Sequence, residues 1–352
     1  MIRSRRKMEH INLALNMDDL KFSNGLEDVV LIHQAVPELD LKEVNLKAPF
    51  LGKELSIPLI INAMTGGIEE AVEINRNLAE VAGAMNIGLA VGSQTIALND
   101  PFTVSSFKVV RKVNPDGVVL ANVSASTQPA EALRAVEMIE ADGLQLHLNT
   151  AQELAMVEGD RCFRGLLDNI KEIMEVSPVP VIAKEVGFGI SREAGQRLYD
   201  AGVRFIDVGG HGGTNFMAIE LKRGGLLNPE FLSWGIPTSV SLSEISDMNF
   251  PITVIASGGI NDGLQAVKAL SLGADIVGVA GFFLKVLLDS GLSGLRRVVE
   301  GYAYEMKCAA LMAGAANLED VFTLPLIIRG DTAKWLNCRG IDIGRWANRN
   351  NV

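Results

Sequence analysis

Eight short apolar runs, each followed by small or polar residues and then by a helical segment, restrict the fold of this chain more than any other feature. The runs are rich in Val, Ile and Leu, as buried strands are. They span residues 58–62, 87–92, 117–123, 143–148, 180–186, 205–210, 252–257 and 275–281. The segments between them, such as 69–85 and 129–141, carry apolar residues at helical spacing. Eight strand–helix repeats without an antiparallel signal predict a (β/α)8 TIM barrel; a doubly wound open sheet is the alternative.

Two stretches depart from a plain barrel. Residues 1–57 precede the first run, and their alternating, Pro-punctuated part at 28–46 predicts a small hairpin or cap under the barrel. About forty residues, 211–249, separate the sixth and seventh runs, which is long for a βα connection and predicts a lid. We therefore expect an N-terminal arm and cap over 1–57. One barrel domain with C-terminal helices is expected over 58–352.

Charge and composition exclude several classes of protein. The formal net charge of −10 argues against a nucleic-acid or anionic-membrane partner. No apolar run reaches the roughly 18 residues of a membrane span, and no secretory leader is evident, so a cytoplasmic protein is expected. Three widely spaced cysteines argue against disulfides or a zinc site. One local exception is the basic start, with Arg3, Arg5, Arg6 and Lys7, which is either a solvated terminus or an arm that meets a compact anion.

The carboxyl ends of the predicted strands carry polar or small residues, and in a barrel these ends converge on one mouth. Glycine-containing turns at 257–262 and 279–283 lead into helices, so their amides can surround a phosphate. Either turn alone is also an ordinary helix start. On the other side of the mouth, residues 63–67 and 91–93 with Asn122 offer amides, a hydroxyl and a carboxamide, which suit the edge of a flat heteroaromatic ring.

Lys184 is a charged residue on an inward-facing position of the fifth run. It shares a face with Ile182, and a buried ammonium needs an anionic partner. A reduced flavin, which is negative at N1, is one such partner. An internal salt bridge is the other.

The stretch HLNTAQE at 147–153 follows the fourth run. Gln145, His147 and Asn149 share one face by the two-residue period of a strand, and this polar face is expected to point into the barrel. Imidazole and carboxamide groups at a barrel mouth are typical of a polar-ligand site.

Glu153 permits two interpretations. It follows Thr150 by three residues, which is the spacing of a capping box. Alternatively, Glu153 and the adjacent Gln152 face a ligand. A carboxylate beside a phosphate-binding mouth requires a cation, so Glu153 indicates Mg²⁺ if the ligand is a diphosphate.

As a set, these strand ends resemble those of the type 2 isopentenyl diphosphate isomerases, FMN-dependent barrels of isoprenoid synthesis. The matching pieces are RRKMEH, MTGG, GSQ, HLNTAQE, KEVGFG, GGTNF..IE, SGGI, GAD..G.AG and RGIDIGRWA. They extend from residue 5 to about residue 346. HLN..QE together with the N-terminal RK.EH is specific, whereas SGG and GAD occur in many phosphate-binding barrels.

The resemblance implies a set of site residues. FMN would contact Met64, Thr65, Gly66, Ser93, Asn122, Lys184, Thr214, Gly258, Gly259, Ala280 and Gly281. The substrate diphosphate would contact Arg6, Lys7, His10, Ser93, Gln94, His147, Asn149 and Gln152. Mg²⁺ would bind Glu153, and the catalytic group would comprise Gln152, Glu153, His147 and Lys184. Gly209 stands where many relatives offer the flavin a serine, so that contact is not expected.

The implied reaction moves a double bond within a five-carbon skeleton by a 1,3-proton shift. A carboxamide is a poor acid or base, so Gln152 is expected to orient the alkene or relay a proton. The hypothesis is that reduced FMN, kept anionic by Lys184, supplies and withdraws the proton. NADPH or NADH would reduce the flavin without being consumed in each turnover. A homo-oligomer, a tetramer or an octamer, is also expected.

Three other functions compete with this one. FMN-dependent 2-hydroxy-acid oxidoreductases carry His-Gly-Gly-Arg near the sixth strand, but here His211 is followed by Thr214 where the arginine should be. A nucleotide dehydrogenase needs a loop cysteine at the mouth, and none of the three cysteines follows a strand end there. A non-catalytic FMN-binding barrel would show no turnover.

Overall fold

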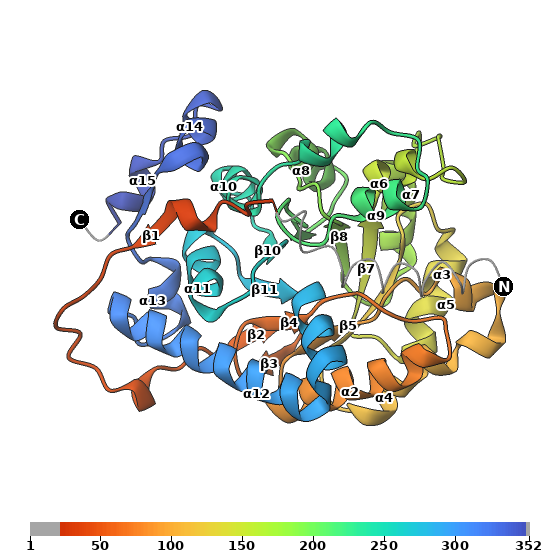
Figure 1. Ribbon diagram of the computed structural model, residues 1–352, viewed down its shortest axis with the longest axis horizontal. Coiled ribbons are helices and arrows are strands. Elements are labelled where there is room, and N and C mark those ends of the chain that lie inside the picture. The colour runs from red at the N-terminus through yellow and green to blue at the C-terminus, as the bar shows by residue number, and fades with distance from the viewer. Residues whose placement is uncertain (1–21, 350–352) are drawn as a thin grey trace.

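Eight parallel strands close into a barrel at the centre of the computed structural model, which describes residues 22–349 (Figure 1). The strands are β4 (Leu59–Ile61), β5 (Gly88–Ala90), β6 (Val119–Ser124), β7 (Gly143–Leu148), β8 (Val181–Glu185), β9 (Phe205–Asp207), β10 (Thr253–Ser257) and β11 (Ile276–Val279). Each predicted run coincides with one of them, and only β6 extends beyond its run, by one residue. Pairing of β11 with β4, with Val277 opposite Leu59, closes the ring. The predicted TIM barrel is therefore confirmed, and the open sheet is excluded.

Helices cover the outside of the barrel. The longer ones are α2 (Glu70–Met85), α4 (Ser105–Val113), α5 (Pro129–Ile139), α7 (Leu166–Val176), α8 (Arg192–Asp200), α10 (Thr238–Asp247), α11 (Gly263–Leu272) and α12 (Gly281–Ala313). The shorter ones are α3 (Thr95–Asn99), α6 (Thr150–Ala155), α9 (Phe216–Lys222), α13 (Leu318–Phe322), α14 (Gly330–Cys338) and α15 (Gly344–Ala347). Single turns of 3-10 helix are η2 (Leu26–Asp28), η3 (Leu41–Glu43), η4 (Pro101–Thr103) and η5 (Pro229–Ser233).

Helix α5 illustrates how the sequence specifies these elements. Pro129 occupies the first helical position, where its fixed φ angle suits the helix and its missing N–H is not needed. The buried residues Ala132, Ala135, Val136 and Ile139 follow helical spacing, so one apolar face lies against the barrel. Strand β6 beneath it is buried on both faces from Val119 to Val123, as expected for a strand between covering helices and a filled interior.

The N-terminal region caps the barrel differently from the prediction. The hairpin is formed by β2 (Ala48–Phe50) and β3 (Lys53–Leu55), and Lys53 Nζ lies 2.7 Å from Asp142 Oδ1 at the start of β7. The segment 28–46 instead contains β1 (Val29–Leu31), which pairs with β12 (Leu326–Ile328) near the other end of the chain. Val29 is fully buried and lies directly opposite Ile328 of β12. The cap is thus tied to the C-terminal part of the chain.

The long insertion contains both a mouth segment and an ordinary barrel helix. Its last third is α10, which packs on α8, α11 and β10. The preceding part forms α9 and η5, and Leu226 N donates to Ala155 O at the end of α6 (2.9 Å). The part of the predicted lid that contains α9 therefore lies beside α6, the helix that begins within HLNTAQE. Within residues 22–349, no helix is both long enough and apolar enough to cross a membrane.

Candidate active site

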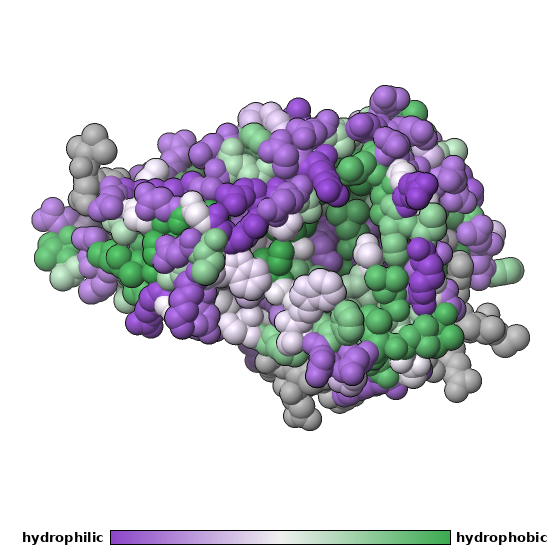
Figure 2. All heavy atoms as spheres, turned by 90° about the horizontal axis from the view of Figure 1, so that it is seen from above, coloured by the Kyte–Doolittle hydropathy of each residue, from purple (hydrophilic) through white to green (hydrophobic). Residues whose placement is uncertain are grey.

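The carboxyl ends of the barrel strands open on one face of the molecule. Helices α6 and α9, which follow β7 and β9, lie toward the top of Figure 1. Figure 2 views the protein from this side and shows a hollow near the centre of the face, with hydrophobic residues gathered around it.

Six polar side chains from different strands or strand ends meet inside the barrel below this mouth. They are Asn62, Asn122, Gln145, Lys184, Asp207 and Ser257, and all are buried. Buried polar groups are costly unless they are hydrogen-bonded, and these six bond to one another. The barrel centre is therefore a polar floor under the mouth rather than an apolar core.

Lys184 finds its anionic partner within the protein. Its Nζ lies 2.8 Å from Asp207 Oδ2 and 3.3 Å from Ser257 Oγ, and the Asp207 side chain is fully buried. The internal salt bridge considered from the sequence is thus present. Asp207 was missed because it lies within an apolar run. The strand register would have indicated this contact, because Lys184 on β8 and Asp207 on β9 are directly paired.

The polar face predicted for β7 does point inward. Gln145 is completely buried and bonds to Asn122 and Asn62. The ring of His147 is half-buried, with Nδ1 2.9 Å from Asn122 Oδ1. Hence Asn122, expected as a flavin contact, also supports the histidine expected at the diphosphate.

Glu153 does not form a capping box. Helix α6 begins at Thr150 with Asn149 as its N-cap and has no side-chain cap. The Glu153 carboxylate instead accepts from Asn149 Nδ2 (2.8 Å) and from the backbone N–H of Asp160 (2.9 Å). These two bonds orient a half-buried carboxylate at the mouth.

Glu153 is suited to bind Mg²⁺ only together with a phosphate-bearing ligand. Among the residues that the structure describes, no group of three His, Cys, Asp or Glu side chains could hold a metal ion. Mg²⁺ is commonly bound by one or two carboxylates together with phosphate oxygens and water. One oriented carboxylate therefore fits a Mg²⁺ ion that arrives with a diphosphate, and does not fit a protein-only metal cage.

Gln152 reaches across to the inserted segment. Its Nε2 donates to Glu220 Oε1 on α9 (3.1 Å), and Glu220 is buried and ion-paired with Arg223. Glu220 was not expected as a site residue, although it belongs to the GGTNF..IE motif. A helical carboxylate gives no local sign that it contacts a glutamine 68 residues away.

Two expected contacts need correction. The side chain of Gln94 is fully buried, where Nε2 donates to Ala135 O (2.9 Å) and Oε1 accepts from Asn122 N (3.0 Å). It therefore holds the loop after β5 in place instead of facing a diphosphate. The Thr65 hydroxyl is also buried and donates to Asn75 Oδ1 (2.6 Å), so only the backbone of Thr65 is left for a flavin.

Three loops converge to form an anion cradle at the ends of β9, β10 and β11. A Cβ on Gly213 would lie 2.7 Å from Gly259 N, and one on Gly281 would lie 2.7 Å from Thr214 Oγ1. Gly258 and Gly259 adopt φ angles of 114° and 77°, which favour glycine. The first amides of α12, after its N-cap Ala280, have no intrahelical acceptors. This backbone-lined cradle fits a phosphate group such as that of FMN.

The loops after β4 and β5 continue the mouth beside this cradle, because β4 is paired with β11. Gly92 N donates to Thr65 O (2.8 Å), which joins the two loops, and the Ser93 hydroxyl lies 3.0 Å from that of Thr95. Met64 and Ser93 are half-buried. A Cβ on Gly66 would lie 2.1 Å from the Phe107 ring, so glycine is required there. Arg6, Lys7 and His10 lie outside the described residues.

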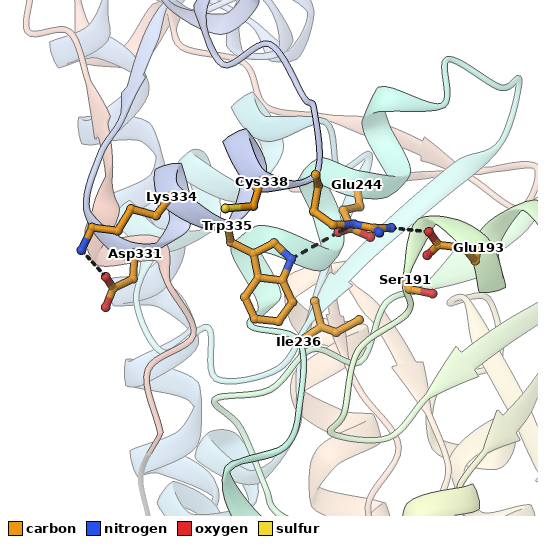
Figure 3. Close-up of a pocket in the computed structure, with 9 residues that line it drawn as sticks. Ser191, Glu193, Ile236, Glu244, Asp331, Lys334, Trp335 and Cys338 are labelled. Carbon is orange, nitrogen blue, oxygen red and sulfur yellow. Dashed lines mark hydrogen bonds and ion pairs between the residues drawn. The ribbon is translucent and has the colours of Figure 1, made fainter.

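A separate cavity of about 600 Å³ lies between α14 and the helices α8 and α10 (Figure 3). Arg339 pairs there with Glu193 and Glu244, and Trp335 Nε1 donates to Glu244 Oε1 (3.3 Å). The Arg339 guanidinium lowers the pKa of Glu193 to about 2. Because these charges satisfy one another, the cluster holds the C-terminal helices on the barrel and points to no ligand.

Glu185 predicts a pH dependence of stability. Burial raises its pKa from 4.5 to about 7, although the amides of Phe188, Gly187 and Gly189 donate to its carboxylate and oppose the rise. The folded protein then binds more protons than the unfolded chain between about pH 4.5 and 7, so this contribution to stability is lost as pH rises through that range. The loss amounts to at most about 3 kcal/mol.

Urea unfolding of the native protein and of Glu185→Gln at pH 5 and pH 8 checks this sign. The native protein should lose stability relative to the variant at the higher pH. If the difference in free energy of unfolding between the two proteins does not change with pH, or changes in the opposite direction, the raised pKa of Glu185 is contradicted.

Comparison with known proteins identifies the family. Residues 127–324 match the model of the FMN-dependent dehydrogenases. The chain is 50% identical to an isopentenyl-diphosphate delta-isomerase of Moorella thermoacetica, over 96% of this chain and 97% of the relative. The chain belongs to the isopentenyl-diphosphate delta-isomerase family. Another member, from Symbiobacterium thermophilum, is 44% identical over 99% of both chains. The resemblance drawn from the strand ends is thereby confirmed.

Solved structures with the same fold include flavin oxidases. A mandelate oxidase bearing an FMN adduct superimposes with a TM-score of 0.66 at 18% identity, covering 91% of this chain and 92% of the oxidase. A lactate oxidase from Pediococcus acidilactici gives 0.68, also at 18%, covering 88% and 86%. At this identity the likeness concerns the fold alone.

Proposed function

We propose that this protein interconverts isopentenyl diphosphate and dimethylallyl diphosphate by a 1,3-proton shift, using reduced FMN and Mg²⁺, in isoprenoid biosynthesis. The observation that carries the proposal is the 50% identity to a named isomerase over nearly the whole of both chains. The site supports it, because the phosphate cradle, the Lys184 ammonium and the Glu153 carboxylate belong to loops and strands that open on one mouth.

The residues that would hold FMN fall into two groups. The cradle residues Thr214, Gly258, Gly259, Ala280 and Gly281 would bind its phosphate, and the loops after β4 and β5 would meet the ring edge. When bound, FMN supplies an electron-rich ring that exchanges a proton with the alkene. Lys184, anchored by Asp207, would supply the cation that stabilises negative charge on the bound flavin.

The diphosphate would be bound from the other side of the mouth. His147, Asn149 and Gln152 bring hydrogen-bonding groups from β7 and α6, with Ser93 across the opening. Glu153 would hold Mg²⁺, which offsets the repulsion between a carboxylate and a diphosphate. The basic residues Arg6, Lys7 and His10 are proposed to add donors to the same anion. Gln152, fixed by Glu220, would orient the alkene.

The geometry weighs against a 2-hydroxy-acid oxidoreductase. Such an enzyme needs a histidine at the mouth and an arginine that binds the acid. Here His211 is buried, its Nδ1 lies 3.1 Å from Gly187 O, and its ring packs 4.6 Å from that of Phe22. Burial also lowers the pKa of His211. Thr214 replaces the arginine, so the chain lacks this carboxylate clamp.

The proposal also covers the reductant, the location, the assembly and the partners of the enzyme. We infer that NADPH or NADH reduces the flavin, that the protein is a cytoplasmic homo-oligomer, either a tetramer or an octamer, and that neither nucleic acid nor a membrane is a partner. The net charge of −10 supports the last point.

Anaerobic incubation of the protein with FMN, dithionite, Mg²⁺ and isopentenyl diphosphate tests the reaction. Dimethylallyl diphosphate should accumulate. In a separate anaerobic sample without dithionite, lactate and mandelate should leave the oxidised flavin unbleached. No isomerisation, together with bleaching by a 2-hydroxy acid, would favour the oxidoreductase.

A further inference from the structure

A chain of hydrogen-bonded side chains crosses the polar floor from Asp207 to His147. Asn62 Nδ2 donates to Asp207 Oδ2 (2.7 Å), and Gln145 Nε2 donates to Asn62 Oδ1 (3.0 Å). Asn122 Nδ2 donates to Gln145 Oε1 (3.0 Å), and Asn122 Oδ1 lies 2.9 Å from His147 Nδ1. Gln145 lies within β7, Asn122 within β6 and Asn62 directly after β4, and each is at most 3% exposed.

Chemistry at the Asp207 end fixes the direction of every bond in this chain. The Asp207 carboxylate is ion-paired with Lys184, and an ionised carboxylate can only accept hydrogen bonds. Asn62 must therefore turn its NH2 group toward Asp207 and its carbonyl oxygen toward Gln145. The backbone N–H of Ala63 confirms this orientation independently, because it donates to the same Asn62 Oδ1 (2.9 Å).

The orientations of the Gln145 and Asn122 amides follow in the same way. An amide that donates from its NH2 group on one side offers its carbonyl on the other, so Gln145 accepts from Asn122. Asn122 then presents Oδ1 to the His147 ring. An oxygen acceptor requires that the facing ring nitrogen carry hydrogen.

We propose that Asp207, acting through Asn62, Gln145 and Asn122, is a positioning residue that fixes neutral His147 as the tautomer with its proton on Nδ1. The lone pair then lies on Nε2, on the other side of the ring. Protonation of the imidazole adds hydrogen at Nε2 and leaves the bond to Asn122 intact, so the ring gains a donor for an anion without reorienting.

This inference deepens the proposed function and rests on it only for the identity of the anion, the substrate diphosphate. One carboxylate then serves both halves of the site: it anchors Lys184 on the flavin side and sets the tautomer of His147 on the diphosphate side. Such a chain is favoured only when every member is satisfied, since each unpaired buried amide is costly.

Nitrogen-15 NMR of the holoenzyme, labelled at its histidines and recorded without substrate at pH 8.5, tests the tautomer. The chain has four histidines, and the ring signals of His147 are assigned by their loss in His147→Asn. The expected spectrum shows Nδ1 protonated and Nε2 unprotonated. A ring protonated mainly on Nε2 overturns the proposal.

Two variants test the origin of the effect. In Asp207→Asn the end of the chain can donate, and only the Ala63 N–H still opposes reversal of the amides, so the Nε2–H form of His147 should rise, though less than in a variant that cuts the chain. In Gln145→Met the chain is cut, and the same shift is expected. Ser243→Ala removes a buried hydroxyl that bonds to Ser239 O on α10, away from the chain, and should leave the tautomer unchanged. An unchanged tautomer in both Asp207→Asn and Gln145→Met contradicts the proposal.

Kinetics separate this inference from the proposed function. Gln145→Met should raise KM for isopentenyl diphosphate roughly tenfold, because a charged His147 ring would lose its oriented acceptor at Asn122 and would be less able to attract the diphosphate. It should change kcat by less than about threefold, because the proton shift does not use this bond. If the protein isomerises nothing, the proposed function fails while the substrate-free spectrum still decides the tautomer. If Gln145→Met does not fold, the spectra of the native protein and Asp207→Asn decide it.

Discussion

Replacing Glu153 with glutamine should reduce Mg²⁺-dependent isomerisation by on the order of 10³-fold while FMN remains bound. Glutamine has one carbonyl oxygen, so it keeps an acceptor either for Asn149 Nδ2 or for the backbone N–H of Asp160. The loop after β7 should still keep its shape, because Arg161 also bonds to the backbone oxygens of Glu153 and Met156. It removes the negative charge that we propose binds Mg²⁺. The flavin spectrum and the rate of dimethylallyl diphosphate formation at increasing Mg²⁺ measure the two properties separately.

Glu175→Gln is the matched control for this experiment. Glu175 is an exposed carboxylate on α7, so its loss changes net charge equally without touching the mouth. It should isomerise at the native rate. Native activity in Glu153→Gln would show that Glu153 holds no essential metal, and loss of folding would assign it a structural role in the loop.

Replacing Lys184 with methionine should abolish activity and lower the free energy of unfolding by about 3–5 kcal/mol. The stability loss follows because the fully buried Asp207 carboxylate would lose its cation at 2.8 Å. Activity should fall because no cation would remain near the proposed flavin ring. The flavin reduction potential should also become more negative, since the reduced anion would lose its stabilisation.

A second substitution separates the two effects of Lys184. In Lys184→Met combined with Asp207→Asn, a neutral amide replaces the unpaired carboxylate, so most of the lost stability should return while activity stays absent. Urea unfolding and the isomerase assay are the measurements. If Lys184→Met alone were as stable as the native protein, the ion pair between Lys184 and Asp207 would not contribute to stability as we expect.

The barrel could be predicted from the sequence because parallel strands covered on both sides read as continuous apolar runs. Every such run coincides with one observed strand, to within one residue. Pairing of β1 with β12 could not be predicted, since it joins segments almost 300 residues apart and each strand has only three residues. Local patterns carry no information about such a distant partner.

The site was predictable in its residue types more than in its contacts. The inward face of Gln145 and His147 followed from the two-residue strand period. Gln94 was placed wrongly because a carboxamide in a strand-end motif looks the same whether it faces a ligand or the backbone. Asp207 and Glu220 were missed because their partners, Lys184 and Gln152, come from other elements of the fold.

The central claim is that the flavin assists a reaction with no net oxidation, and the consumption of reductant tests it most directly. Under anaerobic conditions with Mg²⁺ and excess isopentenyl diphosphate, NADPH or NADH should be oxidised in an amount equal to the bound flavin and then no further, while dimethylallyl diphosphate continues to accumulate over many turnovers. Reductant consumed in step with product, or product formed at the full rate by the fully oxidised enzyme, would contradict the account.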